Sequence, residues 1–145
     1  MAQVSTYLNF PGNTEEAFNL YKSVFGTEFM GPIARHGDVP MPDEAPPLSD
    51  ADKNMVINVA MPILADHLLM GTDVPESMGF PFVAGNNVHI CLHPDTRGES
   101  DRIFAALSEG GTVENALAEM FWGDYWGSFT DKFGIHWMIN SESKA

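Results

Sequence analysis

The chain has 145 residues, of which 44% are hydrophobic and 19% charged, as in a folded globular domain. Twenty acidic and seven basic side chains give a formal net charge of −13. A surface this negative repels phosphate backbones and anionic headgroups, so we expect neither nucleic acid nor a membrane as a partner.

The compartment can be predicted from the cysteine count and the hydropathy. A single cysteine, Cys91, excludes an internal disulfide and suits a reducing compartment. The first residues lack the basic and apolar regions of a signal peptide. Polar residues and a proline interrupt the most apolar run, 55–71, so it cannot span a bilayer. We therefore expect a cytoplasmic protein.

The chain opens with a predicted strand and helix. Residues 4–10 alternate between apolar side chains and a polar face that carries Tyr7 and Asn9, which predicts a strand. After Pro11-Gly12, apolar residues at helical spacing predict a helix that begins at Asn13, with Glu16 as a possible capping-box partner. The helix is expected to stop at Gly26, which suits the left-handed position after a helix.

Three further strands are predicted in the first half, at 27–35, 55–61 and 66–72. The stretch 36–54 between two of them contains four prolines and five acidic residues and has little apolar periodicity. Nineteen residues without an element are long for a connection within a domain. We interpret this stretch as a mobile acidic loop or, alternatively, as a lid or an arm that packs on a second subunit.

The second half repeats this order. Residues 87–94 predict a strand with His89, Cys91 and His93 on one face, and a helix is predicted at about 97–109, ending at Gly110. The last strands are expected near 112–120, 124–130 and 135–140.

The two halves are offset by a constant distance. Ser5 and His89 lie 84 residues apart, and so do the helix-ending glycines Gly26 and Gly110. We therefore predict one α+β domain of two tandem βαβββ units, at about 1–80 and 85–145. With one helix per sheet, the other sheet faces are free to form a curved mixed sheet around a cleft that binds a small ligand.

A C-terminal pattern is specific enough to suggest a family. Residues 121–140 read FWGDYWGSFTDKFGIHWMIN and contain the spacing W-G-x-x-x-G-x-x-x-D-x-F-G-x-x-W, and residues 15–26 read EEAFNLYKSVFG. With the tandem units, these segments resemble the PhnB-like branch of the vicinal oxygen chelate superfamily. That superfamily includes glyoxalase I, extradiol dioxygenases, fosfomycin-resistance enzymes and bleomycin-binding proteins. The resemblance covers nearly the whole chain and implies a homodimer.

The resemblance also implies a divalent metal, held by one ligand from the first and one from the last strand of each unit. The matching positions here are Ser5, Leu69 give or take one residue, His89 and Met138. Only His89 is a strong ligand, because serine rarely binds a metal and a thioether is too soft for Mg, Mn or Ni. We therefore expect no metal at that position and no cofactor. A relocated site is a second hypothesis, with ligands drawn from His67, His89, His136 and Asp73.

Seven residues are predicted to bind a ligand in the cleft: Tyr7, Asn9, Asn58, His89, Trp122, Tyr125 and Met138. His89 is also the best candidate for catalysis, as a general base, or else a structural histidine. Trp137 and Ile139 have the parity of core residues, and 131–134 is the expected turn between the last two strands. Cys91 is more typical of a small core residue than of a nucleophile.

These features predict a PhnB-like protein that binds a small molecule without the metal of the family. The first alternative is a lyase, isomerase or dioxygenase that uses a metal or His89. The second is a resistance protein that sequesters a drug. Methyl transfer is not expected, because the chain lacks a glycine-rich nucleotide loop and the doubly wound order of strands and helices.

Overall fold

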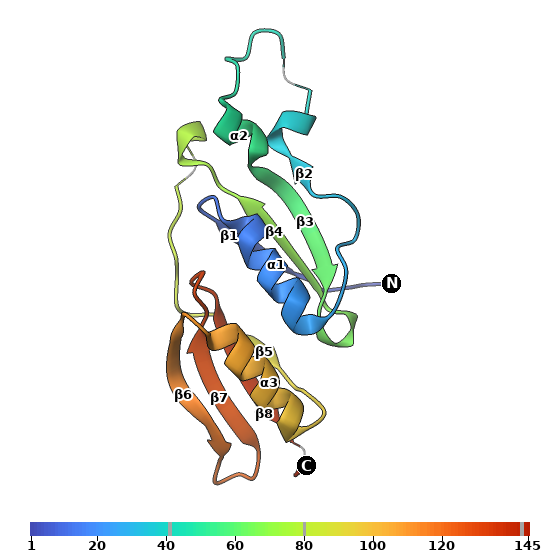
Figure 1. The fold of residues 1–145 in the computed structure, drawn as a ribbon, viewed down its shortest axis with the longest axis vertical. Helices are drawn as coiled ribbons and strands as arrows, with labels where there is room; N and C mark the ends of the chain where they lie inside the picture. Colours follow the sequence, from blue (N-terminus) through green and yellow to red (C-terminus); the bar gives the residue numbers. More distant parts are fainter. Residues whose placement is uncertain (41, 80, 143) are drawn as a thin grey trace. The chain divides into compact units, whose positions relative to one another are not determined.

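The computed structural model of the chain describes residues 1–40, 42–79, 81–142 and 144–145. The chain forms two compact units, Met1–Val83 and Ala84–Ala145. Each unit contains one four-stranded sheet, and the two sheets have the same order, β1-β4-β3-β2 and β5-β8-β7-β6 (Figure 1). The fold is therefore the predicted α+β arrangement of two βαβββ units.

The first unit begins with strand β1, and its last strand, β4, lies parallel to β1 in the sheet. The other neighbours, β3–β4 and β2–β3, are antiparallel. The elements are β1 Thr6–Phe10, α1 Thr14–Phe25, β2 Ala34–Arg35, β3 Val56–Pro62 and β4 Leu68–Asp73, with a short helix α2 Asp50–Asn54 and the 3-10 turns η1 His36–Asp38, η2 Leu64–Asp66 and η3 Glu76–Met78.

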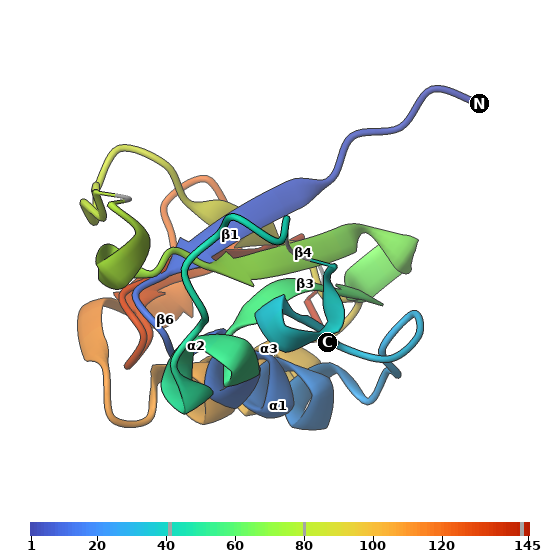
Figure 2. The same cartoon turned by 90° about the horizontal axis from the view of Figure 1, so that it is seen from above.

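Helix α1 covers one face of the first sheet (Figure 2). Phe18 is fully buried there and meets the rings of Phe10 and Tyr21 edge to face, with centroids 6.2 and 5.5 Å apart. Such aromatic pairs add to the free energy gained by burying apolar area. The helix ends at Gly26 in the predicted left-handed conformation, with φ of 66°.

Strand β4 passes so close to α1 that only glycine fits at position 71. A Cβ at Gly71 would overlap the ring of Phe18 and lie 2.9 Å from the Thr14 methyl group. We expect Gly71→Ala to lower the free energy of unfolding by about 1–3 kcal/mol, because both neighbours are fully buried and cannot move aside. Chemical denaturation measures this.

Gly98 is the matched control, because it lies in the first turn of helix α3 (Arg97–Ser108), and a Cβ added there would meet no atom closer than 4.0 Å. Gly98→Ala is expected to stabilise the protein by about 0.5–1 kcal/mol. Equal effects of the two alanines would contradict the proposed overlap at Gly71.

Three details of the first unit differ from the sequence prediction. The strand expected at 27–35 is reduced to Ala34–Arg35, because Gly31 has φ of 125° and Pro32 has no N–H for a ladder. The stretch 36–54 carries η1 and α2, and Ser49 caps α2 by accepting a hydrogen bond from the Asp52 N–H at 3.1 Å. Asn13 makes no side-chain capping bond to α1.

The second unit repeats the arrangement, with β5 parallel to β8 and antiparallel pairs elsewhere. Its helix packs against a core in which Phe104 meets Phe129 with centroids 4.8 Å apart. Trp137 and Ile139 are fully buried, as predicted. The elements are β5 Ile90–Leu92, α3 Arg97–Ser108, β6 Thr112–Glu119, β7 Tyr125–Thr130 and β8 His136–Ser141.

The predicted turn between β7 and β8 is confirmed. The Gly134 N–H donates to the Asp131 carbonyl at 3.0 Å, and Gly134 has φ of 88°, a conformation that favours glycine. Among the helices of the described residues, none is long and apolar enough to cross a membrane.

Candidate functional site

Helix α3 covers one face of the second sheet, and we call the opposite face, which α3 does not cover, the open face. Strand register places His136, Met138 and Asn140 of β8 opposite Thr130, Ser128 and Trp126 of β7. These residues alternate with the buried Trp137, Ile139 and Phe129, which lie on the helix side. Side chains on alternate positions of a strand point to opposite faces, so these six residues lie on the open face.

A β-bulge in the edge strand β6 brings Glu114 to the same face. The register passes from Val113 opposite Phe129 to Asn115 opposite Ser128, which leaves Glu114 as the extra residue. A bulge re-aims side chains, and here two successive residues reach the open face. Glu114 accepts a hydrogen bond from the Thr130 hydroxyl at 3.0 Å, and the Asn115 amide donates to Ser128 Oγ at 2.9 Å.

His136 is held at both ring nitrogens. Its Nε2 lies 2.9 Å from the Gly85 carbonyl oxygen, and its Nδ1 lies 2.8 Å from Thr130 Oγ1. A carbonyl can only accept, so Nε2 carries a proton. Nδ1 of the neutral ring then keeps its lone pair, directed at Thr130.

Thr130 has one hydroxyl proton and two candidate acceptors, Nδ1 of His136 and the Glu114 carboxylate. If the proton goes to His136, Glu114 loses its hydrogen bond from Thr130. If it goes to Glu114, Nδ1 of His136 receives no donor from Thr130. The Thr130 hydroxyl therefore couples the hydrogen bonding of His136 to that of Glu114.

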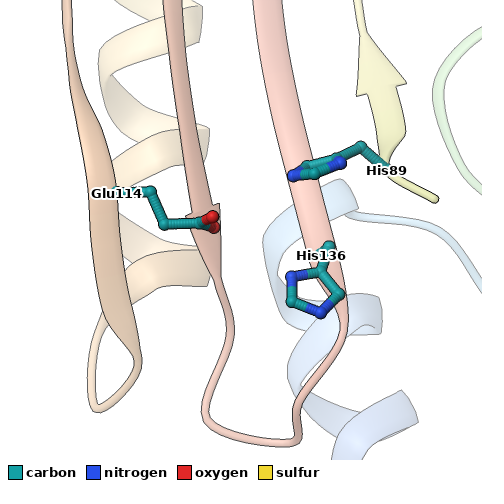
Figure 3. A group of neighbouring side chains, drawn as sticks. All are labelled: His89, Glu114 and His136. Atoms are coloured by element: carbon teal, nitrogen blue, oxygen red, sulfur yellow. The ribbon is translucent and has the colours of Figure 1, made fainter. Parts of the chain in front are cut away.

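His89, the residue just before β5, completes the cluster. Its ring lies 5.4 Å from that of His136, centroid to centroid, at an interplanar angle of 51°. One ligand atom each from His89, Glu114 and His136 can be chosen so that all three lie within 4.8 Å of one another. Figure 3 shows the Glu114 carboxylate pointing toward the two imidazole rings.

Of the other residues predicted in the second unit, Met138 lies on the open face but Tyr125 does not. Tyr125 pairs with Ser141 on the helix side, where its hydroxyl donates to Asp101 at 2.5 Å and its ring stacks under Arg97. The bond to Asp101 raises the pKa of Tyr125. Its placement with Met138 was therefore wrong.

Trp122 and Cys91 are both exposed. Trp122 lies in the β6–β7 turn, half exposed, and meets Phe121 edge to face. Cys91 lies beside Met138 on the open face, and desolvation by neighbouring atoms raises the pKa of its thiol. A raised thiol pKa disfavours the thiolate. The exposed Cys91 is not the small core residue that the sequence predicted.

The residues predicted in the first unit lie on its own open face. Tyr7 and Asn9 of β1 are exposed and alternate with residues that face α1, and Asn58 of β3 is half-buried. The Ser5 hydroxyl lies 3.8 Å from Met70 Sδ. Leu69 is fully buried on the helix side, so Met70 is the open-face residue at the family's last-strand position.

The metal positions of the family therefore read Ser5, Met70, His89 and Met138. One strong ligand in four does not fit a divalent ion that prefers oxygen and nitrogen ligands. Two residues of the relocated set are also structural, because His67 Nε2 bonds Thr6 Oγ1 at 2.9 Å and Asp73 is buried under the start of α1. Only His89 and His136 of that set lie together.

Comparison with known proteins agrees with the fold. Residues 2–140 match the model of the family described as 3-demethylubiquinone-9 3-methyltransferase. A putative member of that description, the PhnB protein of Bacillus cereus, superposes with a TM-score of 0.76 at 24% identity, over 97% of this chain and 99% of that one. This chain belongs to the PhnB-like family.

Two further relatives of this PhnB-like chain match along nearly its whole length. Protein YjdN of Escherichia coli is 30% identical over 94% of this chain and 93% of its own. Protein PA1353 of Pseudomonas aeruginosa is 32% identical with a TM-score of 0.83, covering 98% of both chains. A glyoxalase/bleomycin resistance/dioxygenase family enzyme from Burkholderia phytofirmans shares the fold, at 17% identity and a TM-score of 0.64. The PhnB-like chain thus shares its fold with an enzyme of the glyoxalase/bleomycin resistance/dioxygenase family.

Two residues of the PhnB-like site, Glu114 and Thr130, were missed by the sequence prediction. Thr130 has the same parity as Met138 once the 131–134 turn fixes the register, so its position on the open face could have been found. Glu114 depends on the bulge, for which residues 112–119 give no glycine or proline signal.

Proposed function

We propose that this PhnB-like protein binds a small, partly aromatic molecule on the open face of its second sheet. The observation that carries the proposal is the hydrogen-bonded network of Gly85, His136, Thr130 and Glu114. Buried or half-buried polar networks usually serve a protein's core, but this one lies on the face that α3 does not cover. A ligand there meets a hydrogen-bond donor and hydrogen-bond acceptors that are already oriented.

The same face offers apolar contact area. Trp126 and Met138 are half-buried beside the network, on neighbouring strands. An aromatic ring can stack on an indole and meet a thioether, while its polar groups meet Thr130 or Ser128. This combination supports a ligand with one aromatic or apolar part and one polar part.

We do not carry the methyltransferase description of the family over to this chain. Both sheets are mixed and contain antiparallel pairs, whereas the nucleotide-binding crevice of the doubly wound fold needs parallel strands on both sides of a switch point. A shared fold also does not imply a shared reaction.

The test is a thermal-shift screen of metabolites and antibiotics in the presence of EDTA, followed by calorimetry of the hits. We expect a hit to bind wild type and to bind Thr130→Val about tenfold or more weakly, because the variant keeps the shape of threonine and loses the hydroxyl that joins the network. Circular dichroism checks that the variant is folded.

Asn58→Ala is the control, because Asn58 lies on the first sheet and was also predicted to bind the ligand. It is expected to leave the affinity unchanged. Binding that survives Thr130→Val and is lost in Asn58→Ala would move the site to the first unit and overturn the proposal. A broad panel without any hit would also overturn it.

A further inference from the structure

We propose that His89, Glu114 and His136 form a binding site for one divalent first-row transition ion, such as Zn²⁺ or Co²⁺. One ligand atom from each residue lies within 4.8 Å of the others, on one face of one sheet (Figure 3). Two imidazoles and one carboxylate are a donor set of catalytic zinc sites and of non-haem iron sites. Ca²⁺ and Mg²⁺ prefer oxygen ligands alone, so this donor set disfavours them.

The hydrogen bonds of His136 suit a metal ligand. A metal-binding histidine usually donates its second N–H to a carbonyl or carboxylate, which fixes the ring and its tautomer. The Gly85 carbonyl accepts from Nε2 at 2.9 Å, so the ion would bind at Nδ1 and displace the Thr130 hydroxyl, which lies 2.8 Å from that atom. Thr130 can then donate its hydroxyl proton to Glu114 and orient that carboxylate as the second ligand.

His89 is free to supply the third ligand. Within the part of the chain that the structure describes, its ring nitrogens have no hydrogen-bond partner, and its ring lies 5.4 Å from that of His136, centroid to centroid. The side chain is half-buried, so an ion and its water can reach it.

The cluster needs only a small contraction to hold an ion. Zinc bonds of about 2.0–2.1 Å in a tetrahedron hold the ligand atoms roughly 3.3 Å apart. Glu114 lies on an exposed edge strand at a bulge and has three side-chain torsions, so it can close the difference without moving the sheet core. Three protein ligands leave a coordination position open for water or for an oxygen of a bound molecule.

The proposed site differs from the familial one, although it shares His89. The resemblance placed one ligand on the first and one on the last strand of each unit, and three of those positions carry serine or methionine. Here all three ligands belong to the second unit, and Glu114 comes from its edge strand. The proposal shares its sheet face with the proposed organic ligand but does not depend on it, because the ion binds protein groups alone.

The test uses the full chain, purified without a histidine tag and stripped with a chelator that is then removed. Calorimetry with Zn²⁺ is expected to give one ion per chain, and Co²⁺ is expected to give visible absorption bands. Glu114→Gln and His136→Ala are each expected to weaken Zn²⁺ binding about tenfold or more, because each removes one of three ligands. Excess Mg²⁺ should not displace the ion.

His93→Ala is the matched control, because His93 is an exposed histidine of the same unit whose Nδ1 lies 2.9 Å from the Asn140 carbonyl oxygen and which lies outside the cluster. It is expected to keep the wild-type affinity. Thr130→Val should weaken the binding of the ion about tenfold, because the hydroxyl that positions Glu114 is lost. Thr130→Ser keeps the hydroxyl and should bind the ion as wild type does.

The metal site would be overturned if wild type did not bind Zn²⁺, or if wild type, Glu114→Gln and His136→Ala bound it with equal affinity. Neither result affects the proposal of an organic ligand, because that screen is run in EDTA. Conversely, a failed ligand screen leaves the Zn²⁺ titration intact. Edge-strand substitutions of an exposed residue such as Glu114 are expected to leave the fold stable.

Discussion

Replacing Asp131 with alanine is expected to lower the free energy of unfolding by about 3–5 kcal/mol, because its buried carboxylate holds the β7–β8 turn. Oδ1 accepts the backbone N–H groups of Phe133 and Ile135 at 2.9 and 3.0 Å, and Oδ2 accepts the indole N–H of Trp137 at 2.9 Å. Asp131 is 3% exposed, so water cannot fully replace it. Urea denaturation gives the change.

The asparagine variant separates the contribution of the backbone hydrogen bonds in the turn from that of the bond to the Trp137 indole. Asp131→Asn can keep both backbone bonds at its carbonyl oxygen, but its amide then faces the Trp137 N–H, donor to donor. We expect Asp131→Asn to lower the free energy of unfolding by about half as much as Asp131→Ala does. In a double-mutant cycle, Asp131→Asn should destabilise the Trp137→Phe protein less than it destabilises wild type. An additive cycle would show that the indole bond contributes nothing.

Asp95 is the exposed control in the same unit, and Asp95→Ala is expected to change the stability by less than about 0.5 kcal/mol.

The strands that lie inside a sheet were predicted well because their side-chain period is a local signal. Residues 135–140 place Trp137 and Ile139 inside, and the turn at 131–134 is marked by its glycine. The register across that turn then follows, and it could have shown that Tyr125 shares the face of Phe129 and not of Met138. That error came from treating the aromatic residues as one group.

The candidate site was harder to predict because its key features are not local. Glu114 reaches Thr130 only through a bulge, which shifts the register of an edge strand without a compositional signal. Gly85 contributes a backbone carbonyl to His136 across 51 residues of sequence. His89 and His136 are separate histidines in the sequence, and their pairing appears only when β5 lies beside β8.

The cap of α1 is also not local in the sequence. The sequence suggested a local box of Asn13 and Glu16, whereas the N–H and the hydroxyl of Thr14, the first helical residue, donate to Asp73, 59 residues away. Its Oδ1 accepts the Thr14 N–H at 3.1 Å and the Thr14 hydroxyl at 2.6 Å, and Oδ2 accepts the Val56 N–H at 2.8 Å. One carboxylate thus ties the helix to the end of β4 and the start of β3.

Asp73→Ala is therefore expected to lower the free energy of unfolding by about 3–5 kcal/mol, as much as the change at Asp131. Thr14 and Val56 are almost fully buried, so their N–H groups would be left without an acceptor. A negative charge at the helix N-terminus would be lost as well. Asp43→Ala, an exposed aspartate of the same unit, is the control and should be near neutral.

Hydrogen exchange distinguishes the two aspartates, because each holds a different compact unit. In Asp73→Ala, amides of α1 and β3 should lose protection first, while those of β7 and β8 keep more of theirs. Asp131→Ala should show the reverse. Thr14→Val removes only the hydroxyl donor and should cost about 1–2 kcal/mol, less than the loss of the whole carboxylate. If Asp73→Ala exposed both units equally, the carboxylate would be supporting more than the start of α1, and the local capping argument would fail.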